Sequence, residues 1–389
     1  MNARLGVRAL PGFLWLSVSI LAAPAGAQHG GHSTTPAAPP AAPGGGHQGH
    51  SDESGPAMLW QMYMDLGSQA YRFGLWSEAE KTFTSAVKEA RTLGATDPRL
   101  ATALNFLGEL YRVQGRLPAA EQALQEALAI REKTQGPEHV TVAETLNNLA
   151  LTRQAMGRDA DARALYRRAL GIWEKSLGPE DLRVALGLNN LAMSYWERGE
   201  SAEAEPLFKR ALAIREKAQG PEHTDVAIAL SNLAGVYRAQ ARYADAEPLY
   251  RRALAILERS QGPDQPGVAV VLGELAESYR LQGRWSDAEG LYRRALKIWE
   301  GAVGSQHPRV ATTLEGLGLV QSGRGNAADA EALLTRALAI YEGPAGDVPE
   351  TRPAQAHILV SLAGVYRTLG KVEQAAAAEA RAATLKAPR

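Results

Sequence analysis

Apolar residues recur along this chain with a period of 42 residues. Six glycines mark equivalent points of the repeat: Gly94, Gly136, Gly178, Gly220, Gly262 and Gly304. If each glycine is counted as position 0, leucine occupies positions 10 and 13 in all six copies, glycine or alanine occupies position 14, and tyrosine occupies position 17 in four copies. Because these positions fall on one face of an α-helix, each repeat is predicted to begin with an amphipathic helix.

A second helical pattern completes each repeat. A glycine at position 21 separates the two patterns in most copies, and alanine then stands at positions 26 and 33. A large residue lies between these alanines at position 30, namely Leu124, Tyr166, Phe208, Tyr250, Tyr292 or Leu334. The alanines are expected to let the two helices approach closely, while the large residue fills the gap beside them. Gly-Pro pairs end the pattern at 136–137, 178–179, 220–221 and 262–263, as expected at a helix C-terminus. Each repeat is therefore predicted to be two antiparallel helices joined by a tight turn.

Two weaker copies flank the six, at residues 63–87 and 359–383. In the last copy Glu379 replaces the large residue at position 30, and the final helix consists mostly of alanine and charged residues. A polar outer face is expected of a terminal repeat, which no neighbour covers. The predicted array thus spans residues 57–389, with repeats at about 57–93, 94–135, 136–177, 178–219, 220–261, 262–303, 304–348 and 349–389.

The spacing L..LG..Y........A...F..A resembles the tetratricopeptide repeat, abbreviated TPR. The length of 42 residues, together with LNNLA, AEPLYRRALAI and GPEH, is most similar to the kinesin light chain type of this repeat. The resemblance implies an all-α fold, a right-handed superhelical solenoid of about eight TPR helix-turn-helix hairpins. It also implies that the concave groove of the solenoid binds a peptide or protein segment.

Asparagines stand on the face of the first helix that points away from the predicted buried stripe. Those at position 12 are Asn148, Asn190 and Asn232, and those at position 11 are Asn105, Asn147 and Asn189. In proteins of the resembled family the first helix lines the groove, so the asparagines at position 12 would form a ladder along it. A primary amide can both donate to and accept from the backbone of an extended peptide. The alternative is structural, with the amides bridging to the neighbouring repeat and fixing its register.

Position 18 places further side chains at the predicted groove edge: Arg112, Trp196, Arg238 and Arg280. These could meet acidic or aromatic side chains of a ligand, and the alternative is a solvated rim. Some TPR domains hold a carboxylate with lysines beside such asparagines. Here the corresponding places hold Ser231, Gly273 and Glu315, so that clamp is not predicted.

The charge balance narrows the possible functions. The chain has 42 basic and 42 acidic residues, and this balance does not favour nucleic-acid binding, whose footprint is a basic excess. Pairs of basic residues recur on the second helix, and Glu205, Glu247 and Glu289 each precede one by four residues, which predicts ion pairs on a solvated outer face.

The absence of cysteine excludes disulfides and thiolate chemistry. No catalytic motif is recognisable, so we expect no enzyme activity and no cofactor.

The N-terminus is predicted to direct export. Arg4 and Arg8 precede the apolar run FLWLSVSILAA at 13–23, and AGA at 25–27 offers a cleavage site before Gln28. Residues 1–27 therefore resemble a signal peptide, and a periplasmic or secreted location is expected, with no stable membrane insertion after cleavage. An uncleaved anchor is the alternative.

Residues 28–56 are predicted to be a disordered tether rich in Gly, Pro and His. His-rich tracts can bind Cu²⁺, Ni²⁺ or Zn²⁺, so His29, His32, His47 and His50 raise the alternative of a metal-handling periplasmic protein, against the simpler reading of a solvated spacer. His139, His223 and His307 all fall at position 3, and we expect loop residues there rather than metal ligands.

Overall fold

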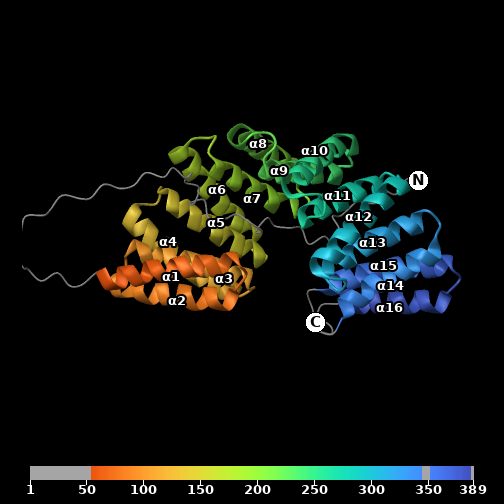
Figure 1. Ribbon diagram of the computed structural model, residues 1–389, viewed down its shortest axis with the longest axis horizontal. Coiled ribbons are helices and arrows are strands. Elements are labelled where there is room, and N and C mark those ends of the chain that lie inside the picture. Colours follow the sequence, from red (N-terminus) through yellow and green to blue (C-terminus); the bar gives the residue numbers. More distant parts are fainter. Residues whose placement is uncertain (1–53, 344–350, 387–389) are drawn as a thin grey trace, which may run out of the picture. The chain divides into compact units, whose positions relative to one another are not determined.

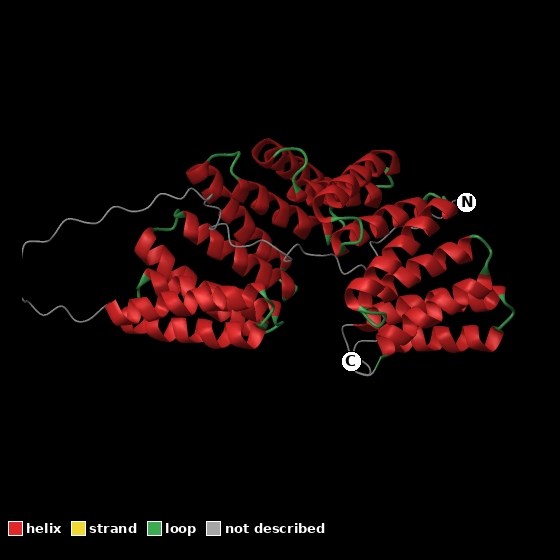
Figure 2. Cartoon of the chain, viewed as in Figure 1, coloured by secondary structure: helices red, strands yellow, loops and turns green. Residues whose placement is uncertain are grey.

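A computed structural model of the protein describes residues 54–343 and 351–386, which form sixteen α-helices and no β-strand (Figures 1 and 2). The helices are α1 (Ser54–Arg72), α2 (Trp76–Leu93), α3 (Pro98–Val113), α4 (Leu117–Gln135), α5 (Val140–Ala155), α6 (Asp159–Leu177), α7 (Leu182–Trp196), α8 (Ser201–Gln219), α9 (Thr224–Ala239), α10 (Tyr243–Gln261), α11 (Pro266–Leu281), α12 (Trp285–Val303), α13 (Pro308–Gly323), α14 (Ala327–Glu342), α15 (Arg352–Thr368) and α16 (Val372–Lys386).

Helix boundaries follow the glycines of the repeat. Gly136, which ends α4, has a φ of 89°, and Gly115, in the turn between α3 and α4, has a φ of 75°. Glycine tolerates this left-handed region because it has no Cβ atom. Ala241 occupies the equivalent turn position between α9 and α10 with a φ of 58°, and it is the only non-glycine residue with positive φ in the described part of the chain. The turn geometry is therefore kept even where the glycine is missing.

Small residues bring the two helices of each hairpin together. A Cβ atom added to Gly108 would lie 2.7 Å from Cγ of Leu124, so α3 and α4 could not approach as closely with any other residue there. The alanines predicted to line the second helix, such as Ala120 and Ala127, are fully buried. The prediction that small residues permit the close contact of the helices is confirmed at this hairpin.

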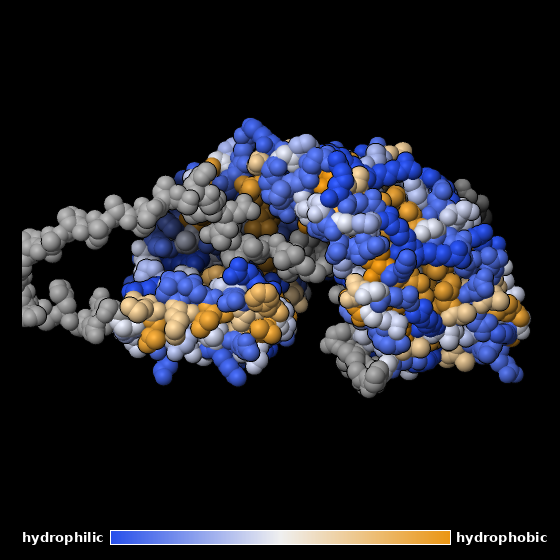
Figure 3. Space-filling model, viewed as in Figure 1, coloured by the Kyte–Doolittle hydropathy of each residue, from blue (hydrophilic) through white to orange (hydrophobic). Residues whose placement is uncertain are grey.

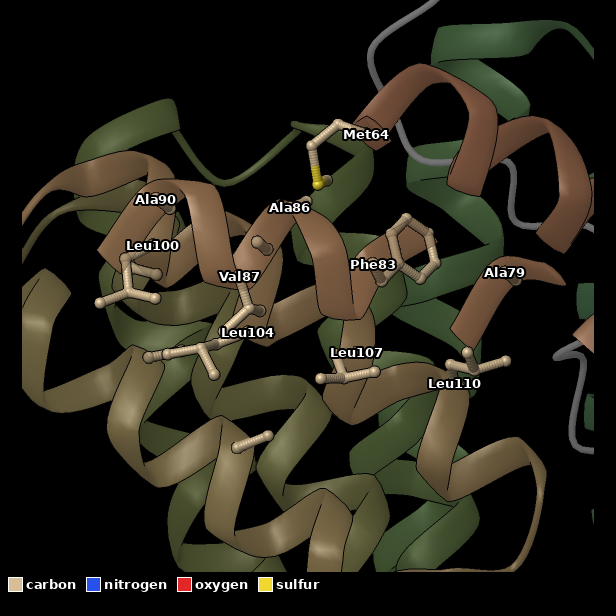
Figure 4. Close-up of a cluster of buried hydrophobic side chains, with 14 of the residues drawn as sticks. Met64, Ala79, Phe83, Ala86, Val87, Ala90, Leu100, Leu104, Leu107 and Leu110 are labelled. Atoms are coloured by element: carbon tan, nitrogen blue, oxygen red, sulfur yellow. The ribbon is translucent and has the colours of Figure 1, made fainter. Parts of the chain in front are cut away.

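The core runs between successive hairpins as well as within them. In Figure 4, Ala90 and Val87 of α2 lie beside Leu100 and Leu104 of α3, and Phe83 belongs to the same buried cluster further along α2. All five side chains are at most 9% exposed. Helix α2 therefore packs on α1 and also on α3, and α4, α8, α10, α12 and α14 likewise pack on the first helix of the next repeat.

The described residues fall into two compact units, an N-terminal unit of residues 54–179 (α1–α6) and a C-terminal unit of residues 180–386 (α7–α16). Each consists of consecutive antiparallel hairpins, which confirms the predicted all-α solenoid architecture. Helix α1 begins at Ser54, three residues before the predicted start of the array at residue 57. Among the described helices, none is long and apolar enough to cross a membrane.

Candidate functional site

The predicted asparagines form hydrogen-bonded pairs between successive first helices. In the N-terminal unit, Nδ2 of Asn148 on α5 donates to Oδ1 of Asn105 on α3 at 3.3 Å. In the C-terminal unit, Nδ2 of Asn232 on α9 donates to Oδ1 of Asn189 on α7 at 2.9 Å. Position 12 of one repeat thus bonds to position 11 of the repeat before it. This is the inter-repeat bridge that the structural alternative predicted.

The two asparagine positions differ in burial. In the N-terminal unit Asn105 and Asn147, both at position 11, are 8% and 5% exposed, whereas Asn189 at position 11 and Asn148, Asn190 and Asn232 at position 12 are half-buried. A primary amide offers two N–H groups and a carbonyl oxygen. In Asn148 and Asn232 one N–H makes the inter-repeat bond, and the other N–H and the oxygen have no hydrogen-bond partner among the described residues. These two amides are therefore fixed in place by the bridge and can still bind a further group.

In the repeat that follows Asn232, position 12 holds a charged residue in place of asparagine. Glu274 on α11 occupies it, and Arg238 Nη2 on α9 lies 3.1 Å from Glu274 Oε2. One turn further along α11, the guanidinium of Arg280 binds both carboxylate oxygens of Glu277, at 2.6 and 2.7 Å. We call these four residues the ionic cluster. Their side chains are between 5% and 17% exposed, so neither arginine lies on a solvated rim.

Burial governs the proton affinities in the ionic cluster. It raises the pKa of the Glu274 carboxyl, an effect that Arg238 opposes and the neighbouring Glu277 reinforces. Burial also lowers the pKa of the Arg238 guanidinium, but the attractions to Glu274, Tyr250 and Glu277 together outweigh that effect, and the pKa of Arg238 is raised. Removing either partner would therefore leave a buried group without its counter-charge.

Tyrosine hydroxyls reach the ionic cluster through the core. The Tyr250 hydroxyl on α10 donates to Glu274 Oε2 at 3.4 Å, and the Tyr292 hydroxyl on α12 donates to Glu277 Oε2 at 3.0 Å. From the sequence we expected the residue at position 30 only to fill space. The presence of tyrosine there, in place of leucine or phenylalanine, indicates a buried polar contact, because a buried phenol needs a hydrogen-bond partner.

The other two residues predicted at the groove edge behave differently. Trp196 on α7 is only 5% exposed, and a Cβ atom on Gly235 of α9 would lie 2.7 Å from its ring. Its ring also meets Phe208 edge-on, with 6.2 Å between centroids, so most of the indole surface packs within the C-terminal unit. Arg112 on α3 is half-buried, and its buried Nε has no hydrogen-bond partner among the described residues.

A small cavity of about 40 Å³ lies beside Glu274. Val270 and Gly273 of α11 and Arg309 and Thr312 of α13 are among the residues that line it. The guanidinium of Arg309 stands over the ring of Trp299, 5.8 Å from the centroid. A Cβ atom on Gly273 would meet nothing within 4 Å, so this glycine leaves the space open. The cavity can hold a few water molecules but not a peptide side chain.

The outer face of the second helices carries the predicted ion pairs. Lys209 lies 2.6 Å from Glu205, Arg251 lies 2.7 Å from Glu247, and Arg293 lies 2.7 Å from Glu289. All three basic side chains are at least half exposed. The prediction of i,i+4 ion pairs on a solvated face is confirmed.

The histidines at position 3 are helix caps. Nδ1 of His139, His223 and His307 accepts a hydrogen bond from the backbone N–H two residues later, at the start of α5, α9 and α13 respectively. Asp97 and Asp181 cap α3 and α7 in the same way. The described residues contain no group of three or more potential ligands placed to hold a metal ion. The histidines of the tether, and residues 1–27, lie outside the described residues, so the predictions made for them stay predictions.

Repeated helical hairpins with a polar first-helix face define this chain as a helical-repeat protein. The model of the tetratricopeptide repeat family matches residues 61–133, 141–217, 183–259, 225–300 and 267–343. The chain therefore belongs to the tetratricopeptide repeat family. Proteins with this fold are in general scaffolds for protein–protein interaction. No curated protein matches the sequence.

Two solved structures, those of NprR and RapI, share the fold. The apo form of the quorum sensor NprR from B. thuringiensis superposes with a TM-score of 0.65 at 16% identity, over 87% of this chain and 89% of that chain. The apo form of RapI gives a TM-score of 0.56 at 15% identity, over 74% of this chain and 97% of that chain. A third structure contains TPR-like repeats of a kinesin light chain from Podosopora anserina, which are nearly identical to one another. It is 25% identical to this chain, with a TM-score of 0.47, over 52% of this chain and 96% of that chain.

Proposed function

We propose that this chain is an exported scaffold that binds an extended segment of a partner protein on the first-helix face of its repeats. The observation that carries the proposal is the state of the amides at position 12. Asn232 and Asn148 are half-buried, held by one hydrogen bond, and retain a donor and an acceptor. An extended peptide presents the complementary N–H and C=O groups along its backbone.

The neighbouring residues favour a segment with apolar side chains. Position 8 lies one turn before position 12 on the same face, and in the C-terminal unit it is held by Leu186, Ile228 and Val270. All three are half-buried, so apolar surface remains exposed beside Asn190 and Asn232. Amides that bond to any backbone, next to apolar side chains, would select for extended conformation and hydrophobicity more than for a particular sequence.

Binding is tested by affinity purification from the cell envelope with the Asn148→Ala, Asn190→Ala and Asn232→Ala triple variant. We expect partners retained by the wild-type chain to be lost or strongly reduced. The matched control changes three exposed residues of the second helices, Arg167, Lys209 and Arg251, to alanine and should retain them. Equal recovery with the asparagine variant would refute the proposed role of the amides.

Export is tested separately by N-terminal sequencing of the chain isolated from its native cells. Cleavage after residue 27 predicts a mature chain that begins at Gln28 and is found outside the cytoplasm. A chain that still carries residues 13–23 and sediments with membranes would support the anchor alternative instead. A full-length chain in the cytoplasm would contradict both.

A further inference from the structure

The first helix, α1, exposes apolar side chains at positions that other first helices bury. Alignment of Leu66–Gly67 with Leu107–Gly108 places Leu59, Met62 and Leu66 at positions 6, 9 and 13, and these are 40%, 44% and 48% exposed. In α9 the same positions hold Val226, Ala229 and Leu233, which are at most 4% exposed. The corresponding residues of α3, α5, α11, α13 and α15 are at most 7% exposed.

The difference arises from what covers each helix. Within each unit the second helices pack on the following first helix, as α2 does on α3 and α8 does on α9, and neighbouring helices run antiparallel (Figure 1). Among the described residues no helix precedes α1. It nevertheless carries leucine and methionine at the positions a preceding helix would cover, whereas a capping helix is expected to be polar there.

The exposed residues of α1 have the spacing of a helix–helix seam. Leu59, Met62, Leu66, Gln69 and Phe73 follow one another at intervals of three and four residues, and all five are exposed. This is the spacing with which two helices pack along their length. Seven of the thirteen exposed large hydrophobic residues of the described chain lie between Met58 and Trp76. Figure 3 shows apolar colouring along the α1–α2 hairpin, which lies at the lower left in Figure 1.

We propose that α1 is a dimerisation helix that packs antiparallel on α1 of a second copy of this chain. A two-fold axis at Leu66 would place Leu66 against itself, Met62 against Gln69, and Leu59 against Phe73. The seam is thus complementary to its own copy, as a two-fold interface requires. The second copy would take the place, and the antiparallel direction, of the preceding helix in the other repeats.

Charge and the opposite end of the array favour this partner. Asp65 and Arg72 are the only charged residues of α1, so two copies can approach without strong repulsion. Head-to-tail stacking would instead require an apolar outer face on α16. That helix has alanine at its buried positions, and charged residues such as Glu379 and Arg381 are exposed on it. The C-terminal end therefore offers no apolar match for α1.

The absence of cysteine allows a direct test by cross-linking. The full chain with Leu66→Cys is oxidised under mild conditions and analysed without reductant. We expect a covalent dimer formed in high yield, because the two introduced thiols would meet at the axis. The control is Val360→Cys on α15, which is also about half exposed (47%) and should remain monomeric. Equal cross-linking of the two variants would overturn the proposal.

Sedimentation gives an independent readout. The wild-type chain should be a dimer at micromolar concentration, and Leu66→Glu or Leu59→Glu should weaken the dimer by about a hundredfold or more. Val360→Glu should leave it unchanged. Because the changed side chains are exposed, circular dichroism should show unaltered folding. A monomeric wild-type chain would overturn the proposal, and hydrogen exchange would then show whether the chain's own upstream residues cover α1. A dimer that both glutamate variants leave intact would overturn it as well. Loss of the dimer with unchanged partner binding would separate this inference from the proposed function.

Discussion

Two neighbouring junctions of the C-terminal unit use opposite chemistry at the same repeat position. Between α7 and α9, the neutral amides of Asn189 and Asn232 share one hydrogen bond and stay half-buried. Between α9 and α11, Arg238 and Glu274 form an ion pair with side chains only 11% and 8% exposed. Both join consecutive first helices, but the amide pair keeps hydrogen-bonding capacity for a ligand, whereas the ion pair is occupied within the protein. Position 12 therefore changes from a candidate binding position to a structural one within a single repeat.

The largest expected effect comes from breaking the ion pair. Arg238→Ala would leave the Glu274 carboxyl buried without its counter-charge, and we expect the free energy of unfolding of the C-terminal unit to fall by about 3–5 kcal/mol. Urea denaturation followed by circular dichroism measures this. The double variant Arg238→Met, Glu274→Leu removes both charges and should lose much less. A single variant as stable as the wild type would mean that the pair is solvated.

Two glycines near position 12 of the first helices differ in the space around them. A Cβ atom on Gly316, at position 12 of α13, would lie 2.5 Å from Cζ of Tyr292, whereas one on Gly273 would meet no atom within 4 Å. Gly316→Ala should therefore cost about 1–3 kcal/mol through overpacking. Gly273→Ala should gain about 0.5–1 kcal/mol, because alanine is the better helix former. Thermal denaturation of the two variants should show shifts of opposite sign, and shifts of the same sign would contradict this packing.

The amide junction should tolerate substitution. Asn232→Ala removes one neutral hydrogen bond from a half-buried site, so we expect a loss of about 0.5–1.5 kcal/mol in unfolding free energy. Chemical denaturation of this variant beside Arg238→Ala tests the contrast directly. A loss as large as that of the arginine variant would show that the amide is a core residue with no capacity to spare for a ligand.

The smallest expected effect is a pH dependence confined to the C-terminal unit. The His357 imidazole on α15 contacts the Glu315 carboxylate on α13, which raises the pKa of His357, while Arg280 and Glu277 act on it more weakly in opposite directions. Because the pKa of His357 is raised in the folded state, its contact with Glu315 stabilises the protein fully below the unfolded pKa of about 6.5. That stabilisation is lost as the pH rises through the pKa of His357 in the folded state. Stability measured across this window should fall with rising pH, and His357→Gln should flatten that part of the curve. An unchanged slope would exclude His357 as its source.

The repeat spacing predicted most of the fold because it records packing within a single hairpin. Positions 10, 13 and 14 and the alanines at 26 and 33 are local to one pair of helices, so a period in the sequence is enough to find them. The candidate site was predicted only in part. The bond between Asn232 and Asn189 joins residues 43 apart, and it depends on how one repeat is set against the next.

The ionic cluster could not be found by the same reasoning. Charged residues on the polar face of a helix are normally solvated, so Arg238 and Arg280 were expected either to bind a ligand or to remain at the rim. Their burial follows from the carboxylates of α11 and from the tyrosines at position 30, a set of contacts that spans the four helices α9 to α12. Only the tyrosine hydroxyls, which require a partner, were visible in the sequence as a sign of buried polar contacts.

Site-specific photocross-linking tests the central claim, that partners bind the first-helix face, most directly. A photoreactive maleimide attached to Ile228→Cys on α9 is compared with the same reagent on Lys209→Cys, on the exposed side of α8. We predict that the partner retained by the wild-type chain becomes covalently attached through position 228 and not through position 209. Attachment through position 209 alone would contradict the account.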